Sequence, residues 1–308
     1  MTIQRMQAQS GPINWQALFD QHALKAHTQR ARKLGPATFL IERVAEDLAD
    51  RLSVVLRKFP IAVDLASPTD AVRQRLAAIG SIGTVASAVV EGRPGDPLRV
   101  IQNEELLPFG DQTLDLVVSA LSLQVVDDLP GTLIQIRRAL KPDGLFLAAM
   151  LGGETLMELR ESFYAAETEV EGGVSPRVIP FVEVREAGAL LQRAGFALPV
   201  ADVDRITVRY ADAFAVMHDL RRMAATNPLL ERRRTPLKRR TVVRMAEIYA
   251  ERFADADGRV RATFDVVWLS GWAPHESQQQ PLKPGSAKSR LADVLGTREV
   301  SAGEKPKR

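Results

Sequence analysis

The chain of 308 residues contains no cysteine. This absence excludes disulfide bonds, thiolate metal sites and a cysteine nucleophile. Long apolar runs are absent too, since none approaches the about 18 residues of a membrane-spanning helix. Residues 1–11 lack the apolar stretch of a secretory signal. We therefore expect a cytoplasmic protein, either free or bound at the inner face of the membrane.

Histidine is scarce, and its positions do not have the spacing of a metal site. The four residues are His22, His27, His218 and His275. We interpret them as surface or capping residues. The sequence also lacks a Ser-His-Asp set, a P-loop and a Gly-x-Gly-x-x-Gly motif, so it predicts no metal and none of the enzyme classes that those motifs mark.

The composition is that of an ordinary globular protein, with 45% hydrophobic and 26% charged residues. The net charge is only +3, but a basic segment lies between residues 221 and 240. It has two interpretations: a solvated surface, or a patch that docks on an acidic partner or an anionic membrane. No aromatic residues alternate with the charges, which argues against nucleic acid. The residues expected in the patch are Arg232, Arg233, Arg234, Lys238, Arg239 and Arg240.

Short apolar runs alternate with helical segments after an amphipathic helix at 38–58. Alternation of this kind predicts an α/β fold with a parallel sheet and helices on both faces. The predicted strands are 61–66, 84–90, 99–102, 114–123, 144–151, 202–210 and 263–272. The predicted helices are 70–79, 129–140, 154–169, 182–194, 212–225 and 235–253, and a turn is expected at Lys141-Pro142-Asp143-Gly144.

Polar residues follow the predicted strands at positions where open α/β sheets bind ligands. Asp64 and the loop 66–70 follow the first strand. Asn103 and Glu104 follow the third, and Ser119 lies near the end of the fourth. We expect these residues to share one edge of the sheet.

Several of these segments resemble the centre of class I S-adenosylmethionine-dependent methyltransferases. They are Leu107-Pro108-Phe109, the run from Thr113 to Ser119, and Leu140-Lys141-Pro142-Asp143-Gly144. Later motifs resemble one branch of this superfamily, that of the mitochondrial complex I assembly factor and its bacterial relatives near the biotin-pathway methyltransferase. These motifs are Gly152-Gly153-Glu154-Thr155-Leu156, Glu171-Gly172-Gly173-Val174-Ser175-Pro176 and His275-Glu276-Ser277-Gln278.

The resemblance implies a Rossmann-like sheet of seven strands, mostly parallel with an antiparallel last strand. It also implies a helical insertion at about 211–256. We expect an N-terminal arm at 1–35, a methyltransferase-like domain at 36–277 and a disordered basic tail at 278–308. S-adenosylmethionine is the implied cofactor, with Asp64, Ala66, Asn103, Glu104 and Ser119 as the candidate binding residues.

The family's cofactor motifs are degenerate in this chain. Ala66, Pro68 and Asp70 stand where the family has glycines that let its backbone approach the cofactor. No acid stands where the family binds the ribose, because that region has the sequence Ala86-Ser87-Ala88-Val89-Val90. Asn103 replaces the acid that contacts the adenine, and Gln124-Val125 replaces His-Trp. We therefore expect S-adenosylmethionine to bind weakly or not at all.

Three functions remain open from the sequence. The chain is either a methyltransferase-family protein with residual activity, or a non-catalytic scaffold for assembly of the respiratory NADH dehydrogenase (complex I), or an arginine-modifying enzyme of the hydroxylase type that acts on a subunit of that complex. The expected partner is accordingly a complex I subunit. Gly152-Gly153-Glu154 and His275–Gln278 are either parts of the site or purely structural.

Overall fold

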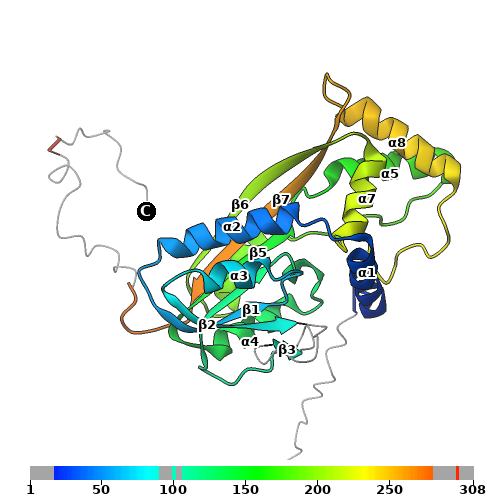
Figure 1. Ribbon diagram of the computed structural model, residues 1–308. Coiled ribbons are helices and arrows are strands. Elements are labelled where there is room, and N and C mark those ends of the chain that lie inside the picture. Colours follow the sequence, from blue (N-terminus) through cyan, green and yellow to red (C-terminus); the bar gives the residue numbers. More distant parts are fainter. Residues whose placement is uncertain (1–16, 90–98, 102–105, 280–295, 298–308) are drawn as a thin grey trace, which may run out of the picture. The chain divides into compact units, whose positions relative to one another are not determined.

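The computed structural model describes residues 17–89, 99–101, 106–279 and 296–297. The chain divides into two compact units, Met1–Pro274 and His275–Arg308. All the helices and strands described below belong to the first unit (Figure 1). The expected tail lies almost wholly outside the described residues.

A sheet of seven strands has the order β3-β2-β1-β4-β5-β7-β6. Strands β1 to β5 pair in parallel, and β7 runs antiparallel to both β5 and β6. The predicted fold class is therefore confirmed. The strands are β1 (Phe59–Leu65), β2 (Ile82–Val89), β3 (Arg99–Ile101), β4 (Leu114–Ala120), β5 (Leu140–Gly152), β6 (Ala197–Tyr210) and β7 (Val260–Trp272).

Helices cover both faces of the sheet because the central strands are apolar on both sides. Val63, Val117 and Phe146 pack against α4 (Leu129–Ala139) and α6 (Val184–Arg193). The alternate residues, among them Ala62 and Leu116, face α2 (Phe39–Ser53) and α3 (Ala71–Ala77). Helix α2 buries the stripe that its sequence predicts, from Leu40 to Leu52.

A helical cover lies at one end of the sheet (Figure 1). It contains α5 (Met157–Glu171), α7 (Ala213–Arg222) and α8 (Arg239–Phe253). Their apolar faces form a separate core with the ends of β6 and β7. Helices α7 and α8 lie between β6 and β7 in the sequence, in the segment that was expected to be the insertion.

The segment predicted as an N-terminal arm contains a helix in its second half, which the sequence analysis did not predict. Helix α1 (Gln21–Leu34) begins at Asp20, whose side chain accepts a hydrogen bond from the Ala23 amide at 3.0 Å. It packs against α7. Phe19 is 5% exposed, and its amide donates to Asp127 Oδ1 at 3.0 Å. Packing and capping thus hold this segment on the cover.

Several other element boundaries differ from the prediction. Helix α2 ends at Ser53 rather than at 58, and Leu56 beyond it is fully exposed. Strand β5 continues through the expected turn, because Asp143 adopts a φ of 64° and the pairing with β4 shifts its register there. Helix α5 begins at Met157 rather than at 154, because Leu156 takes a φ of 56° and residues before it form a turn.

Candidate functional site

A cavity of about 1280 Å³ lies at the carboxyl ends of β1 and β4. The loop 66–70 and the short helix η1 (Leu123–Val125) form one wall. Residues of α1, α7 and the segment after α7 form the opposite wall. The cavity exceeds the usual range for small-molecule sites, about 300–1,000 Å³. The cover therefore encloses space beside the strand ends that the sequence singles out.

Ala66 adopts a left-handed backbone conformation at the position where the family has its first glycine. Its φ is 58°, in the left-handed region that glycine adopts without cost. Its amide donates to the Ala88 carbonyl at 2.7 Å, which ties the loop to β2. The tight turn is therefore retained although the alanine adds a methyl group at the cavity wall.

Serine hydroxyls hold this loop against β4. Ser119 Oγ is buried and donates to the Leu65 carbonyl at 2.9 Å. Ser67 Oγ accepts from the Ala120 amide at 3.1 Å. Ser122 Oγ lies 2.8 Å from Ser119 Oγ. The Ser119 hydroxyl is thus engaged within the protein, and Ser119 does not line the described cavity.

Asp64 is buried behind the loop rather than at the cavity surface, with 3% of its area exposed. Burial raises its pKa to about 7, and the nearby Asp70 adds to the shift while hydrogen bonds from Ser67 oppose it. Oδ1 has no hydrogen-bond partner among the described residues. Near neutral pH, this carboxyl group is therefore protonated in a large fraction of molecules.

The other predicted cofactor residues are only partly visible. Asn103 and Glu104 lie outside the described residues. At the end of β2, Ser87 is 2% exposed and Val89 lines the cavity; residues 86–89 include no carboxylate. Gln124 lines the cavity and donates from Nε2 to the Leu121 carbonyl at 2.8 Å, while its Oε1 is buried without a partner among the described residues.

The Gly152-Gly153-Glu154 motif is a packed turn. A Cβ added at Gly152 would lie 2.4 Å from Val267 Cγ2. Gly153 has a φ of 50°, and the Glu154 amide donates to Asp265 Oδ2 at 3.0 Å. The motif therefore fixes the junction between β5 and the cover. The His275–Gln278 segment belongs to the second unit, where His275 Nδ1 and Ser277 Oγ lie 2.7 Å apart.

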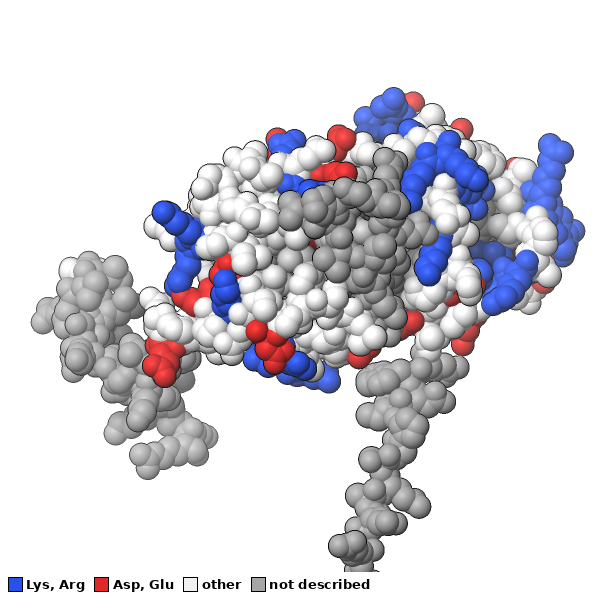
Figure 2. Space-filling view, turned by 60° about the horizontal axis from the view of Figure 1, so that its bottom comes forward, with Lys and Arg blue, Asp and Glu red and all other residues white. Residues whose placement is uncertain are grey.

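The basic segment is only partly an exposed patch, so its prediction needs correction. Arg232 pairs with Asp20 at 2.8 Å, and both Arg233 and Lys238 pair with Glu171. These contacts hold the segment to α1 and α5. The residues of the predicted patch that remain mainly exposed are Arg234, Lys238, Arg239 and Arg240. Figure 2 shows lysine and arginine side chains gathered at the end that carries the cover.

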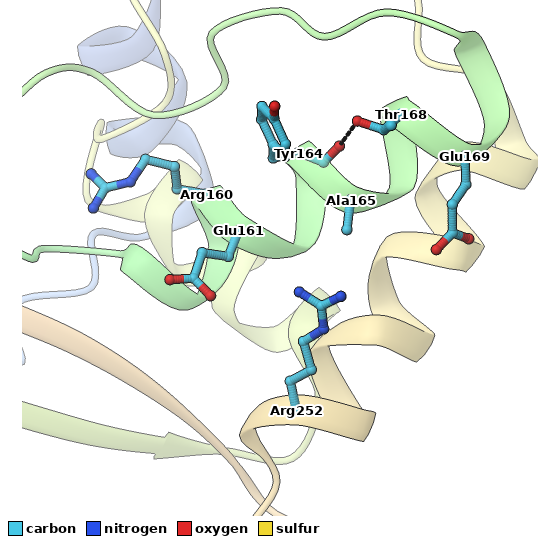
Figure 3. Close-up of a pocket in the computed structure, with 7 residues that line it drawn as sticks. All are labelled: Arg160, Glu161, Tyr164, Ala165, Thr168, Glu169 and Arg252. Carbon is cyan, nitrogen blue, oxygen red and sulfur yellow. Dashed lines mark hydrogen bonds between the residues drawn. The ribbon is translucent and has the colours of Figure 1, made fainter.

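A second, smaller cavity of about 540 Å³ lies between α5 and α8 (Figure 3). Its lining includes Tyr164, Glu169 and Arg252, and Thr168 Oγ1 donates to the Tyr164 carbonyl at 2.8 Å. None of the predicted site residues lines it. Across the described part of the chain, no group of three or more His, Cys, Asp or Glu side chains is arranged to hold a metal.

The chain is similar to methyltransferases and to proteins named arginine-hydroxylase. A family model described as "Methyltransferase domain" matches residues 81–148. The human protein "Arginine-hydroxylase NDUFAF5, mitochondrial" is 42% identical over 266 residues, which cover 83% of this chain and 77% of that protein. The Danio rerio protein of the same name is 40% identical, covering 83% and 82%. A malonyl-[acyl-carrier protein] O-methyltransferase from Xylella fastidiosa is 31% identical, covering 83% of each chain.

The chain belongs to the class I S-adenosylmethionine-dependent methyltransferase superfamily. A solved structure, the YcgJ protein of Bacillus subtilis, supports the same fold with a TM-score of 0.50 at 11% identity, covering 76% of this chain and 99% of that one. Among the described residues of this methyltransferase-superfamily chain, no helix is long and apolar enough to cross a membrane.

The serine contacts and His27 were missed by the sequence-based prediction. Single hydroxyl groups form no motif, so Ser67 and Ser122 gave no signal. His27 lies on α1 and lines the cavity, whereas the sequence indicates only a surface or capping residue. The Asp20 N-cap was the available signal, since it predicts that a helix carries His27.

Proposed function

We propose that this protein acts in the assembly or modification of the respiratory NADH dehydrogenase, and that its cavity binds S-adenosylmethionine only weakly. The involvement of that complex rests on the branch resemblance of the late motifs, supported by the high identity to proteins named arginine-hydroxylase. The proposal rests mainly on the cavity beneath the cover. One wall of this cavity is formed by the altered loop 66–70.

The loop does not fit the cofactor as the family's glycine loop does. Pro68 has no amide hydrogen to donate and fixes its own φ. Ala66 and Asp70 add side chains where the family presents bare backbone, and both line the cavity. A hydrogen bond lost at such a site costs about 1–3 kcal/mol, which corresponds to roughly a tenfold loss of affinity for every 1.4 kcal/mol.

Two alternatives have specific support. A non-catalytic scaffold is favoured by the loop, since a protein that only binds a partner needs no cofactor. An arginine-modifying enzyme is favoured by the name of the relatives. A scaffold would bind its partner through the surface of the cover, whereas an arginine-modifying enzyme would bind its substrate in the cavity.

Two measurements test the proposal. Calorimetric titration of the purified protein with S-adenosylmethionine and S-adenosylhomocysteine should give a dissociation constant of about tens of micromolar or weaker; sub-micromolar binding would contradict a weakened site. Complementation of a deletion strain, scored as assembled NADH dehydrogenase activity, should succeed with the wild-type gene. Failure of the wild-type gene would remove the assignment to that complex.

The same strain separates the alternatives. Asp64→Ala should complement if little catalysis depends on the cofactor site. Val117→Asp, which places a carboxylate at a position 2% exposed, is the unfolded control. If Asp64→Ala fails to complement while the protein stays folded, a catalytic function is the better assignment.

A further inference from the structure

The wall of the large cavity carries a strong excess of positive charge. Among the described residues that line it, seven are lysine or arginine, and a single one, Asp70, is acidic. A concave wall of one sign raises the local concentration of ligands of the opposite sign. The imbalance therefore bears directly on which ligands this cavity takes.

Three of the cations are already neutralised by carboxylates. Arg177 pairs with Glu167, Arg222 with Asp219 at 3.1 Å, and Arg233 with Glu171 at 3.4 Å. The pairs of Arg177 with Glu167 and of Arg233 with Glu171 tie segments of the cover to α5, whereas Arg222 and Asp219 both lie on α7. They contribute little net charge to the cavity.

Three other cations have no such neutralisation. Lys25 and Arg30 lie on α1 and Arg221 lies on α7, and all three are exposed. In the part of the chain that the structure describes, no carboxylate pairs with any of them. Arg30 is oriented by one neutral contact, from Nη2 to Thr226 Oγ1 at 2.9 Å. Because α1 packs beside α7 (Figure 1), the three cations share one wall.

His27, on α1, lies near some of the same positive charges. Burial lowers its pKa to about 4, and the charges of Arg30 and Arg232 lower it further, while a hydrogen bond to the Thr226 backbone and the charge of Asp20 oppose the shift. The imidazole is therefore neutral at pH 7. It neither adds to nor offsets the positive charge of the wall.

We propose that the wall formed by α1 and α7 binds an anionic group, a carboxylate or a phosphate, through Lys25, Arg30 and Arg221. Guanidinium groups match both anions with paired N–H donors. A cationic guanidinium ligand would meet like charges here, so an arginine substrate would have to occupy another part of the cavity than this wall. The inference rests on the proposed function in that it names the ligand class of the same cavity.

Calorimetric titration of the full chain at low salt tests this inference with three probes: succinate, inorganic phosphate and methylguanidinium. Either succinate or phosphate should bind, and the stronger of the two identifies the anion, while methylguanidinium should show no binding. Arg30→Gln and Arg221→Gln should each weaken anion binding about tenfold, and Arg30→Lys should retain most of it. Arg160→Gln, in the wall of the second cavity, is the matched control and should bind like the wild type.

The inference is overturned if neither anion binds, or if methylguanidinium binds as well as the anions do. It is also overturned if Arg30→Gln and Arg221→Gln bind the anion as tightly as the control Arg160→Gln. Thermal unfolding checks that the variants are folded, and Arg30 and Arg221 are exposed, so their replacement should not unfold the chain. The outcome is independent of complementation: anion binding without rescue of NADH dehydrogenase would refute the proposed function alone.

Discussion

Arg205 and Asp265 form a two-point ion pair between β6 and β7, with Nε 2.7 Å from Oδ1 and Nη2 2.8 Å from Oδ2. Asp265 also accepts the Glu154 amide and has 4% of its side chain exposed. Burial opposes its ionisation, but the Arg205 and Glu154 contacts outweigh burial and lower the pKa of Asp265. One carboxylate thus joins both strands to the start of the cover.

Asp265→Asn should therefore destabilise the protein. The variant loses the charge-assisted hydrogen bonds, each worth about 1.5–3 kcal/mol, so we expect a loss of about 2 kcal/mol or more in urea unfolding. Asp111→Asn is the control, because Asp111 pairs with Arg138 on the open surface, where a pair contributes less than about 1 kcal/mol. Equal losses of stability in both variants would show that the buried pair contributes no more to stability than the exposed pair does.

Ala66→Gly should stabilise the chain. A left-handed alanine costs about 1–2 kcal/mol, and the greater freedom of an unfolded glycine offsets about half of that, so a gain of about 0.5–1 kcal/mol is expected. Ala77→Gly, at the exposed last residue of α3, should instead lose stability, by less than the about 1 kcal/mol of a helix interior.

The double variant Ala66→Gly, Pro68→Gly extends this test to the cofactor. It restores bare backbone and an amide hydrogen, so S-adenosylhomocysteine should bind at least about tenfold more tightly than to the wild type in calorimetry. Unchanged affinity would show that the loop does not limit binding.

Asp64 should make stability depend on pH. Its folded pKa of about 7 exceeds the ordinary 3.8, so between these values the folded state keeps a proton that the unfolded state releases. Stability from this group is therefore full below the lower pKa and is lost as pH rises to about 7. At about 1.4 kcal/mol per pKa unit, the loss has an upper bound of about 4 kcal/mol.

Asp64→Asn stays neutral and should abolish that contribution. Urea unfolding of both proteins at pH 5 and pH 8 measures it, since the other titrating groups cancel in the difference. The variant should gain relative to the wild type at the higher pH. If the two proteins show parallel pH profiles, Asp64 does not titrate in this range.

The exposed cations of the basic segment should bind anionic surfaces, while the pair of Arg232 with Asp20 stabilises the cover. Arg234→Gln with Arg239→Gln should weaken co-sedimentation with vesicles of anionic phospholipid about tenfold or more at low salt, at about 1 kcal/mol per cation. The thermal midpoint should change little, because Arg234 reaches Asp20 only at 4.0 Å and has 69% of its side chain exposed. Arg232→Gln breaks the pair with Asp20 and should lower the midpoint. If the double variant binds vesicles as well as the wild type, the basic segment is only a solvated surface.

The sequence predicted those parts of the fold in which a regular pattern coincides with burial. The stripe from Leu40 to Leu52 identified α2, and apolar runs around Val63 and Val117 identified β1 and β4. Helix α1 escaped prediction because its buried residues are Ala23 and Ala31, and alanine does not mark an apolar face.

The site was predictable only where its residues lie close together in the sequence. The glycine-free loop identified one wall of the cavity, and the structure shows that Ala66 still adopts the turn. The pairs of Arg232 with Asp20 and of Lys238 with Glu171 join residues far apart in the chain. Such long-range contacts leave no local pattern, so an exposed patch was predicted where four of the six basic residues form ion pairs.

The position of β7 between β5 and β6 has a consequence for how the protein comes to be folded. Strand β5 ends at Gly152, but its partner β7 begins only at Val260. During synthesis, the edge of β5 therefore stays unpaired until nearly the whole domain has been made. An unpaired strand edge can form hydrogen bonds with other chains and so promotes aggregation. Closure also requires contacts of large sequence separation, which slow folding. A chain truncated before β7 would thus expose the β5 edge of its five-stranded parallel sheet and be prone to aggregate.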